Sequence, residues 1–143
     1  MDAKYIDIHA HVNFAAFDTD REEVVARARE AGVAMINVGT QKDTSASAVA
    51  LAEKYDGVYA AVGLHPIHTD ASHHDAEELG AGGFFSRGEV FDYDYYKKLA
   101  AHPKVVAVGE CGLDVFRSGE AGKLEKQKEV FRKQIALAIE VEK

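Results

Sequence analysis

The chain has 143 residues, of which 47% are hydrophobic and 29% charged, with one cysteine and a formal net charge of -7. This composition is typical of one globular domain with a real core, and it excludes a disordered chain, a collagen-like chain and a disulfide framework. The acidic balance argues against a basic face that grips duplex DNA, although bound divalent cations can supply positive charge to a nucleic-acid substrate.

No part of the sequence resembles a membrane span or an export signal. The apolar runs are far shorter than the roughly 20 residues that cross a bilayer. The first residues lack a basic region followed by an apolar stretch, so no secretory signal is expected. With Cys111 as the single cysteine, these features predict a protein of the reducing cytoplasm.

Short apolar strands alternate with longer helical patterns along the chain. A first strand is expected over residues 5–9, and a capping box of Thr19 and Glu22 predicts the start of a helix that ends at Gly32. A second strand is expected over 33–38. The buried face of this first helix is expected to hold Val24, Val25, Ala28 and Ala31.

The next units repeat this pattern. A helix capped by Asp43 or Thr44 is predicted to run to Tyr55, and a third strand follows over 58–62. A fourth strand is expected over 105–108 and a last helix from about residue 122 onward. The apolar faces of the two helices are Ala48, Leu51, Ala52 and Tyr55, and Leu124, Phe131, Ile135 and Ala138.

The connection between the third and fourth strands is unusually long. Residues 91–96 are expected to begin the helix before the fourth strand, and the Gly-rich segment 81–85 to form a loop or lid within an insert near 66–91. His73 and His74 are interpreted as solvated loop residues, because adjacent side chains of an extended segment point apart. The tyrosines of the connection are expected to pack rather than to stack on bases: Tyr93, Tyr95 and Tyr96.

Four strands that are each followed by a helix predict parallel βαβ units with right-handed crossovers, and therefore an α/β fold. The strands are continuously apolar, which is typical of parallel strands covered on both faces. A complete (β/α)₈ barrel takes about 250 residues, so 1–143 is expected to be a single domain with room for about half of one.

The sharpest chemical feature is the pair of His9 and His11 at the end of the first strand. Residues i and i+2 of an extended segment point to one face, so both imidazoles can reach one metal ion. The alternative is a pair of polar residues that are solvated or hydrogen-bonded at a strand end. Because this spacing is common by chance, the pair alone does not define a site.

Two further polar residues follow the third and fourth strands. Glu110 comes directly after 105–108, and its carboxylate would meet His9 and His11 if the sheet curls into a barrel. By itself, Glu110 could instead pair with a lysine or arginine. His65 follows the third strand and is either a substrate-facing histidine or proton donor, or a residue that orders its own loop.

Other enzyme chemistries lack a matching motif. Cys111 stands next to Glu110 but has no base at a recognisable spacing, so catalysis by a cysteine nucleophile is not expected. The sequence contains no Walker loop and no G-x-G-x-x-G motif after a strand, which leaves a nucleotide cofactor unsupported.

Taken together, these segments resemble the N-terminal part of the TatD family of metal-dependent hydrolases, within the amidohydrolase superfamily. The motifs that carry the resemblance are IDIHAH at 6–11, AVGLHP at 61–66 and VAVGECGLD at 106–114, in this order. Weaker matches are Asp20-Arg21 through Gly32-Val33, Val38-Gly39-Thr40 and the helix pattern of Gln127, Phe131, Gln134 and Ala138.

The resemblance implies the N-terminal half of a TIM-type (β/α)₈ barrel, with about four βα units. It implies one or two divalent metal ions (Zn, Mg or Mn) held by His9, His11 and Glu110, with Glu110 also catalytic. His65 and Asp114 would face the substrate. The implied reaction is hydrolysis of phosphodiester bonds, commonly in DNA from an exposed end, where metals lower the pKa of a bound water and neutralise charge on the phosphate.

Asn13 and Val115 stand where the family usually has an aspartate and an aromatic residue, and the insert near Phe84 departs further. The family also uses two later histidines and an aspartate, for which these 143 residues offer no counterpart, so low activity is expected of the chain by itself. The alternatives are a degenerate half-barrel that binds metal or a partner, two copies that close one barrel as a homodimer, and hydrolysis of another ester or amide.

Overall fold

The computed structural model describes residues 2–74, 84–116 and 121–143, and side chains in these ranges outside 71–87 and residue 121. The elements, with 3-10 helices written η, are β1 (Tyr5–Ala10), η1 (Ala15–Phe17), α1 (Arg21–Glu30), β2 (Val33–Val38), α2 (Lys42–Lys54), β3 (Val58–Val62), η2 (Pro66–Thr69), β4 (Ala71–His74), β5 (Phe84–Arg87), α4 (Tyr93–Ala100), β6 (Val105–Val108) and α5 (Ala121–Glu140).

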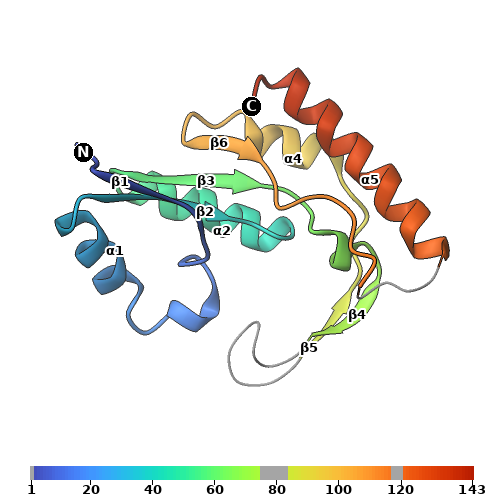
Figure 1. Cartoon of the computed structure of the whole chain (residues 1–143), viewed down its shortest axis with the longest axis horizontal. Coiled ribbons are helices and arrows are strands. Elements are labelled where there is room, and N and C mark those ends of the chain that lie inside the picture. The colour runs from blue at the N-terminus through green and yellow to red at the C-terminus, as the bar shows by residue number, and fades with distance from the viewer. Residues whose placement is uncertain (1, 75–83, 117–120) are drawn as a thin grey trace.

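Four of the strands form one parallel sheet, in the order β1-β2-β3-β6 (Figure 1). The apolar runs predicted from the sequence coincide with β2, β3 and β6, and β1 extends one residue beyond its predicted end. The expected parallel α/β architecture is therefore confirmed, and the carboxyl ends of all four strands lie at one edge of the sheet.

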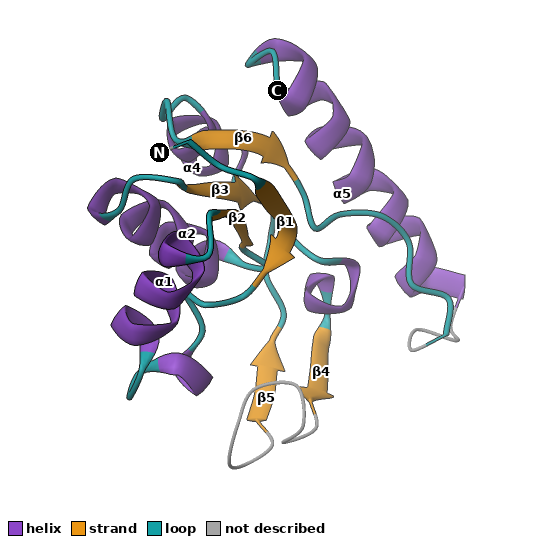
Figure 2. Ribbon diagram, turned by 60° about the vertical axis from the view of Figure 1, so that its left-hand side comes forward, coloured by secondary structure: helices purple, strands orange, loops and turns teal. Residues whose placement is uncertain are grey.

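The helices α1, α2 and α4 gather on one side of the sheet (Figure 2). In the resulting core, α2 packs against β2 and β3, and α4 packs against β3 and β6. Tyr96 of α4 is fully buried there, stacked on Phe91 with ring centroids 4.6 Å apart. The expectation that the tyrosines of this segment pack inside the protein is confirmed for Tyr96, and Tyr93 and Tyr95 pack against the same core.

The strand β1 departs from the prediction that the strands are covered on both faces. Tyr5, Ile6 and Ile8 are 68%, 62% and 73% exposed. The reason is position: β1 lies at the edge of the sheet and pairs with β2 alone among the described residues. The opposite edge, at β6, is also open, and Val106 there is 39% exposed.

Both predicted helix caps were placed wrongly by a few residues. α1 begins after Asp20 rather than after Thr19, and no cap side chain bonds its first N–H groups. α2 begins after Gln41, so Asp43 lies within its first turn. Thr44 still satisfies the helix start, because its Oγ1 accepts the Gln41 N–H at 2.9 Å. The end of α1 at Gly32, with φ of +75°, is as predicted.

The long third connection contains two short strands that the sequence did not predict. β4 and β5 pair antiparallel, and Figure 2 shows the pair extending away from the parallel sheet. His73 and His74 therefore lie in a strand, not in a loop, because main-chain pairing with Phe85 and Phe84 extends this segment. Of the predicted Gly-rich loop, 81–83 lie outside the described residues. None of the described helices combines the length and the apolarity that crossing a membrane takes.

Candidate metal centre

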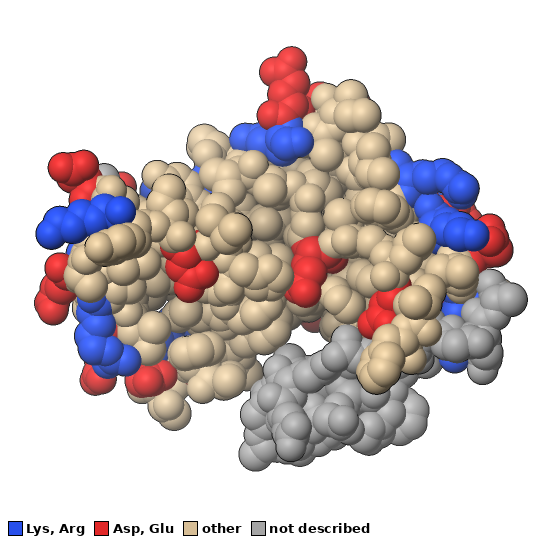
Figure 3. All heavy atoms as spheres, in the orientation of Figure 1, with Lys and Arg blue, Asp and Glu red and all other residues tan. Residues whose placement is uncertain are grey.

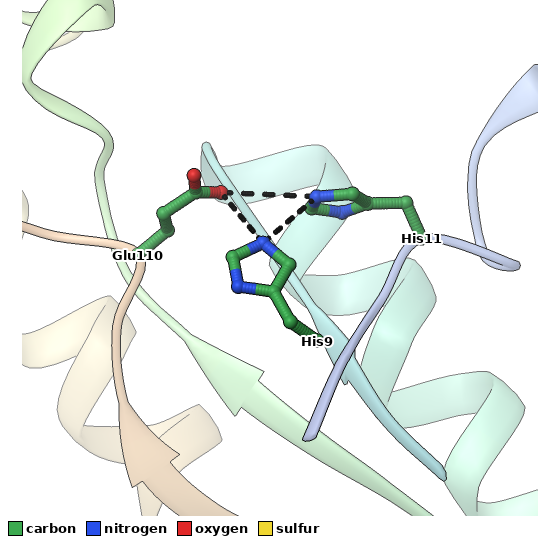
Figure 4. A group of neighbouring side chains, drawn as sticks. All are labelled: His9, His11 and Glu110. Carbon is green, nitrogen blue, oxygen red and sulfur yellow. Dashed lines mark hydrogen bonds and ion pairs between the residues drawn. The ribbon is translucent and has the colours of Figure 1, made fainter. Parts of the chain in front are cut away.

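The two histidines of the first strand converge at the carboxyl edge of the sheet. The Nε2 atoms of His9 and His11 lie 3.2 Å apart (Figure 4). The Nδ1 atom of His11 lies 2.8 Å from the carbonyl oxygen of Val38, to which it donates. Because that contact places the proton on Nδ1, the lone pair of Nε2 faces His9 and is free to bind a metal ion.

The ring of His11 is also held from the side. Phe14 stacks on it with a centroid distance of 4.4 Å and an interplanar angle of 29°. A turn brings Phe14 there, since its N–H donates to the His11 carbonyl at 2.9 Å. Sequence reasoning missed Phe14 and Val38, although the three-residue spacing between His11 and Phe14 is the kind of signal that a turn leaves.

Glu110 follows β6 and turns its carboxylate toward both imidazoles. Its Oε2 atom lies 3.6 Å from Nε2 of His9 and 3.8 Å from Nε2 of His11. Two donors bound about 2.1 Å from one ion lie at most about 4.2 Å apart, so all three separations suit a common metal ion. Within the described residues, His9, His11 and Glu110 form a group able to hold a metal, with half-buried to exposed side chains.

His65 lies on the other side of the same carboxylate. Its Nε2 atom is 3.7 Å from Oε1 of Glu110, and the side chain is only 17% exposed. Its Nδ1 accepts the Ile67 N–H at 3.2 Å, so the neutral ring carries its proton on Nε2. The ring thus orders its own loop, which is one of the two interpretations left open by the sequence, and its Nε2 faces Glu110. A role toward a substrate stays a prediction.

Asp114 and Cys111 lie near this group but do not join it. The Oδ1 atom of Asp114 accepts the Phe116 N–H at 3.0 Å, within the segment that follows β6. Burial raises the pKa of the Cys111 thiol, and a raised pKa disfavours the nucleophilic thiolate. That Cys111 is not a nucleophile stays a prediction.

Two buried glutamines of α5 hold the segments that carry these residues. Gln134 receives the Leu64 N–H at 2.8 Å and donates to the Leu64 carbonyl at 2.9 Å, directly beside His65. Gln127 accepts the Asp114 N–H at 2.9 Å. Both side chains are 1% exposed. The helix pattern singled out these glutamines, but their role was not predicted because it depends on contacts 13 and 70 residues away.

Asn13, two residues after His11, fixes the segment that follows β1. Its Nδ2 donates to the Thr44 carbonyl at 2.9 Å, and the side chain is buried. Arg21 holds the same segment by donating to the carbonyl oxygens of Val12 and Phe14 at 2.7 and 2.8 Å. The segment after β1 is thereby fixed to both α1 and α2.

Comparisons with known proteins identify relatives of this chain. The sequence model of the family described as "TatD related DNase" matches residues 6–143. The chain is 42% identical over 136 residues to "Uncharacterized metal-dependent hydrolase YabD" of Bacillus subtilis, covering 94% of this chain and 46% of the relative. It is 35% identical over 136 residues to "3'-5' ssDNA/RNA exonuclease TatD" of Cronobacter sakazakii, covering 94% and 45%.

A solved structure shows the same fold. The crystal structure of the TatD homolog YjjV from Escherichia coli aligns with a TM-score of 0.68 and 32% identity, over 99% of this chain and 49% of that one. The chain spans about half the length of the relatives it matches. Its four parallel strands and their helices thus correspond to half of a TIM-type barrel, as expected.

Proposed function

Because the chain belongs to the family of TatD-related DNases, we propose that it supplies the metal-binding half of a hydrolase that cleaves phosphodiester bonds in single-stranded nucleic acid. The observation that carries the proposal is the convergence of His9, His11 and Glu110, whose three donor atoms suit one divalent ion. The resemblance is to metal-dependent hydrolases, and some relatives are named as exonucleases of single-stranded DNA or RNA.

The donor set restricts the ion. Imidazole nitrogens suit zinc and manganese, and a carboxylate oxygen suits magnesium and manganese, so each of these ions is compatible with two histidines and one glutamate. His9 and His11 would hold the ion, and Glu110 would ligate it or bridge to a second one. When bound, such an ion supplies a water of lowered pKa and positive charge against a phosphate.

The remaining residues act on the substrate side. His65 presents its Nε2–H beside Glu110, where it can donate a hydrogen bond to a phosphate oxygen. Glu110 is the expected catalytic residue, because its second oxygen is available to hold or receive a proton. Asp114 fixes the backbone of the adjoining segment, which borders the place where a substrate would lie.

The charge distribution favours a bound metal ion as the group that attracts the phosphate. On the face seen in Figure 3, acidic and basic side chains are mixed, with no continuous basic band among the described residues of that face. Since the net charge is -7, a bound cation would help to attract a nucleic-acid strand. Nucleic acid is therefore proposed as the substrate, reached through the metal rather than through lysine and arginine.

A second candidate arrangement is favoured by the open sheet. β1 and β6 both have an unpaired edge among the described residues, and both run parallel to their neighbours. A second copy could place its β1 beside β6 of the first, and the reciprocal pairing would close one barrel. That homodimer could be a hydrolase of this or another ester or amide, or a non-catalytic metal-binding module. A cytoplasmic location stays a prediction.

The test is metal content and cleavage by the purified chain. We expect bound metal in the wild type after dialysis, and loss of stoichiometric metal in the His9→Ala, His11→Ala double variant. Any metal-dependent cleavage of single-stranded DNA, expected to be weak, should fall by at least about 100-fold in Glu110→Gln. His102→Ala is the matched control, because His102 pairs with Glu53 and lies outside this group. Unchanged metal binding in the double variant would refute the site.

A further inference from the structure

A cavity of about 410 Å³ adjoins the candidate metal centre and shares one candidate ligand, Glu110, with it. It is lined by His65, Glu110 and Asp114 and by the apolar residues Leu113, Val115 and Phe116, together with neighbouring backbone. Because Glu110 both lines this cavity and belongs to the candidate metal centre, a group that fills the cavity would lie beside an ion held by His9, His11 and Glu110.

The apolar walls of the cavity are unusually exposed. Phe116 is 94% exposed, Val115 is 68% and Leu113 is 46%. Apolar side chains gain free energy when a ligand shields them from water, and three exposed ones within four residues form a surface suited to a flat apolar group. These side chains lie at the rim of a cavity that Glu110, the proposed catalytic residue, also lines.

The backbone that carries these side chains is fixed from two directions. Gln127 of α5 accepts the Asp114 N–H at 2.9 Å, and the carboxylate of Asp114 accepts the Phe116 N–H at 3.0 Å. The start of the Phe116 side chain is therefore placed by hydrogen bonds. A ring presented from a fixed backbone costs less conformational entropy to use in binding.

The charges of the cavity decide which part of a nucleotide enters it. Besides the candidate ligand Glu110, Asp114 places a second carboxylate in the wall, and a carboxylate that binds no metal repels a phosphate. The uncharged part of the nucleotide has no such penalty. With the phosphate at the metal, the base is the uncharged, planar group that reaches an adjacent apolar wall.

We infer that this cavity is a nucleobase subsite, in which one base of a single-stranded nucleic acid stacks on Phe116 while its phosphate lies at the metal. The inference rests on the proposed function and adds to it a group that recognises the strand without reading its sequence. Stacking on an aromatic ring tolerates every base, since each has a π-face.

The experiment measures binding rather than cleavage. Fluorescence anisotropy, with Mn²⁺ present, compares a short single strand of thymidines with a strand of equal length made of abasic residues. We expect the wild type to bind the base-bearing strand about 10-fold more tightly. Phe116→Ala should abolish this preference, and Phe116→Trp should keep it. Ile139→Ala is the control for removal of an exposed apolar side chain, because Ile139 is 74% exposed on α5.

Each result separates the subsite from the reaction. Equal affinity for the two strands, no measurable binding of either, or a preference that survives in Phe116→Ala would overturn the subsite. Metal-dependent cleavage of the base-bearing strand tests the proposed function independently. Base-dependent binding without cleavage would refute the hydrolase proposal for this chain and retain the subsite. Cleavage without base-dependent binding would refute the subsite and retain the hydrolase proposal.

Discussion

His11 shows how a single residue is prepared for metal binding. Its Nδ1 donates to the Val38 carbonyl, and its ring face lies on Phe14. The first contact fixes the tautomer and the second restricts the ring, so the Nε2 lone pair is directed before any ion arrives. Contacts of this kind behind a ligand typically change metal affinity by 10- to 100-fold.

Phe14→Leu is therefore expected to weaken metal binding without removing a ligand. The leucine keeps an apolar group but not the flat face that supports the His11 ring, so we expect about 10-fold lower affinity by isothermal titration calorimetry. Phe17→Leu is the matched control, since Phe17 lies in η1 and has no ring contact with His11 among those described. Equal affinities in the two variants would show that Phe14 does not support the ligand.

Tyr96 is a single residue that makes the stability of the fold depend on pH. Burial, and then the hydrogen bond to the Glu89 carboxylate at 2.7 Å, raise the pKa of the Tyr96 hydroxyl well above its ordinary value of 10.0. The folded chain holds this proton more tightly than the unfolded chain does. Its contribution to stability is thus complete below about pH 10 and declines as the pH rises further.

We expect Tyr96→Phe to be about 1 kcal/mol less stable than the wild type at neutral pH, because it loses the hydrogen bond to Glu89. Its loss of stability above pH 10, measured by urea denaturation, should be shallower than that of the wild type. Tyr59→Phe is the control for removal of a tyrosine hydroxyl, since Tyr59 lies on β3 outside the Tyr96–Glu89 pair. A Tyr96→Phe slope equal to the wild type would mean that Tyr96 does not carry the effect.

Among the elements, α5 supplies hydrogen bonds to the segments that follow β3 and β6. Gln134 satisfies both the N–H and the carbonyl of Leu64, and a Cβ at Gly63 would lie 2.8 Å from Oε1 of Gln134 and 2.9 Å from the Gly109 carbonyl. The ends of β3 and β6 approach so closely there that only glycine fits at position 63. This contact sets the distance between the residues that follow, His65 and Glu110.

Gln134→Leu should destabilise the fold by about 2–4 kcal/mol. The leucine fills a similar volume, but it leaves the buried N–H and carbonyl of Leu64 without partners, each costing about 1–3 kcal/mol. Ile135→Ala, at the neighbouring and 45% exposed position, should cost far less. Chemical denaturation of the two variants compares these costs. Similar values would indicate that water replaces the amide.

The elements also show what a sequence can and cannot predict. The strands at 33–38, 58–62 and 105–108 were found because a buried parallel strand is a continuous apolar run. The caps were misplaced because Thr19, Asp20, Asp43 and Thr44 all have cap chemistry, and tertiary contacts choose among them. The β4–β5 pair was missed because its short segments are stabilised by main-chain pairing rather than by a periodic pattern.

For the whole molecule, the site was predictable where it depends on topology. His9, His11 and Glu110 were expected to meet because parallel strands end at one edge, and the structure brings them within 4.8 Å. Val38, Phe14 and Gln134 were not predictable in their roles, because they act through contacts between distant segments. The length of the chain predicted about half of a barrel, and the solved structure agrees, since the chain covers 49% of it.

The open sheet predicts self-association. β1 exposes Tyr5, Ile6 and Ile8 along an unpaired edge, which is a template for pairing with another chain. Sedimentation velocity at increasing concentration should show dimers or larger species, and Ile8→Lys should shift the population toward monomer. A chain that stays monomeric at every accessible concentration would exclude the homodimer that closes a barrel.

The order of the strands in space, β1-β2-β3-β6, is also their order along the chain. During synthesis, β2 and β3 can each dock on the strand made just before them, whereas β6 joins β3 only after the β4–β5 pair and α4 have been made. Until then the outer edge of β3 stays open, so the long third connection decides when this sheet gains its fourth strand.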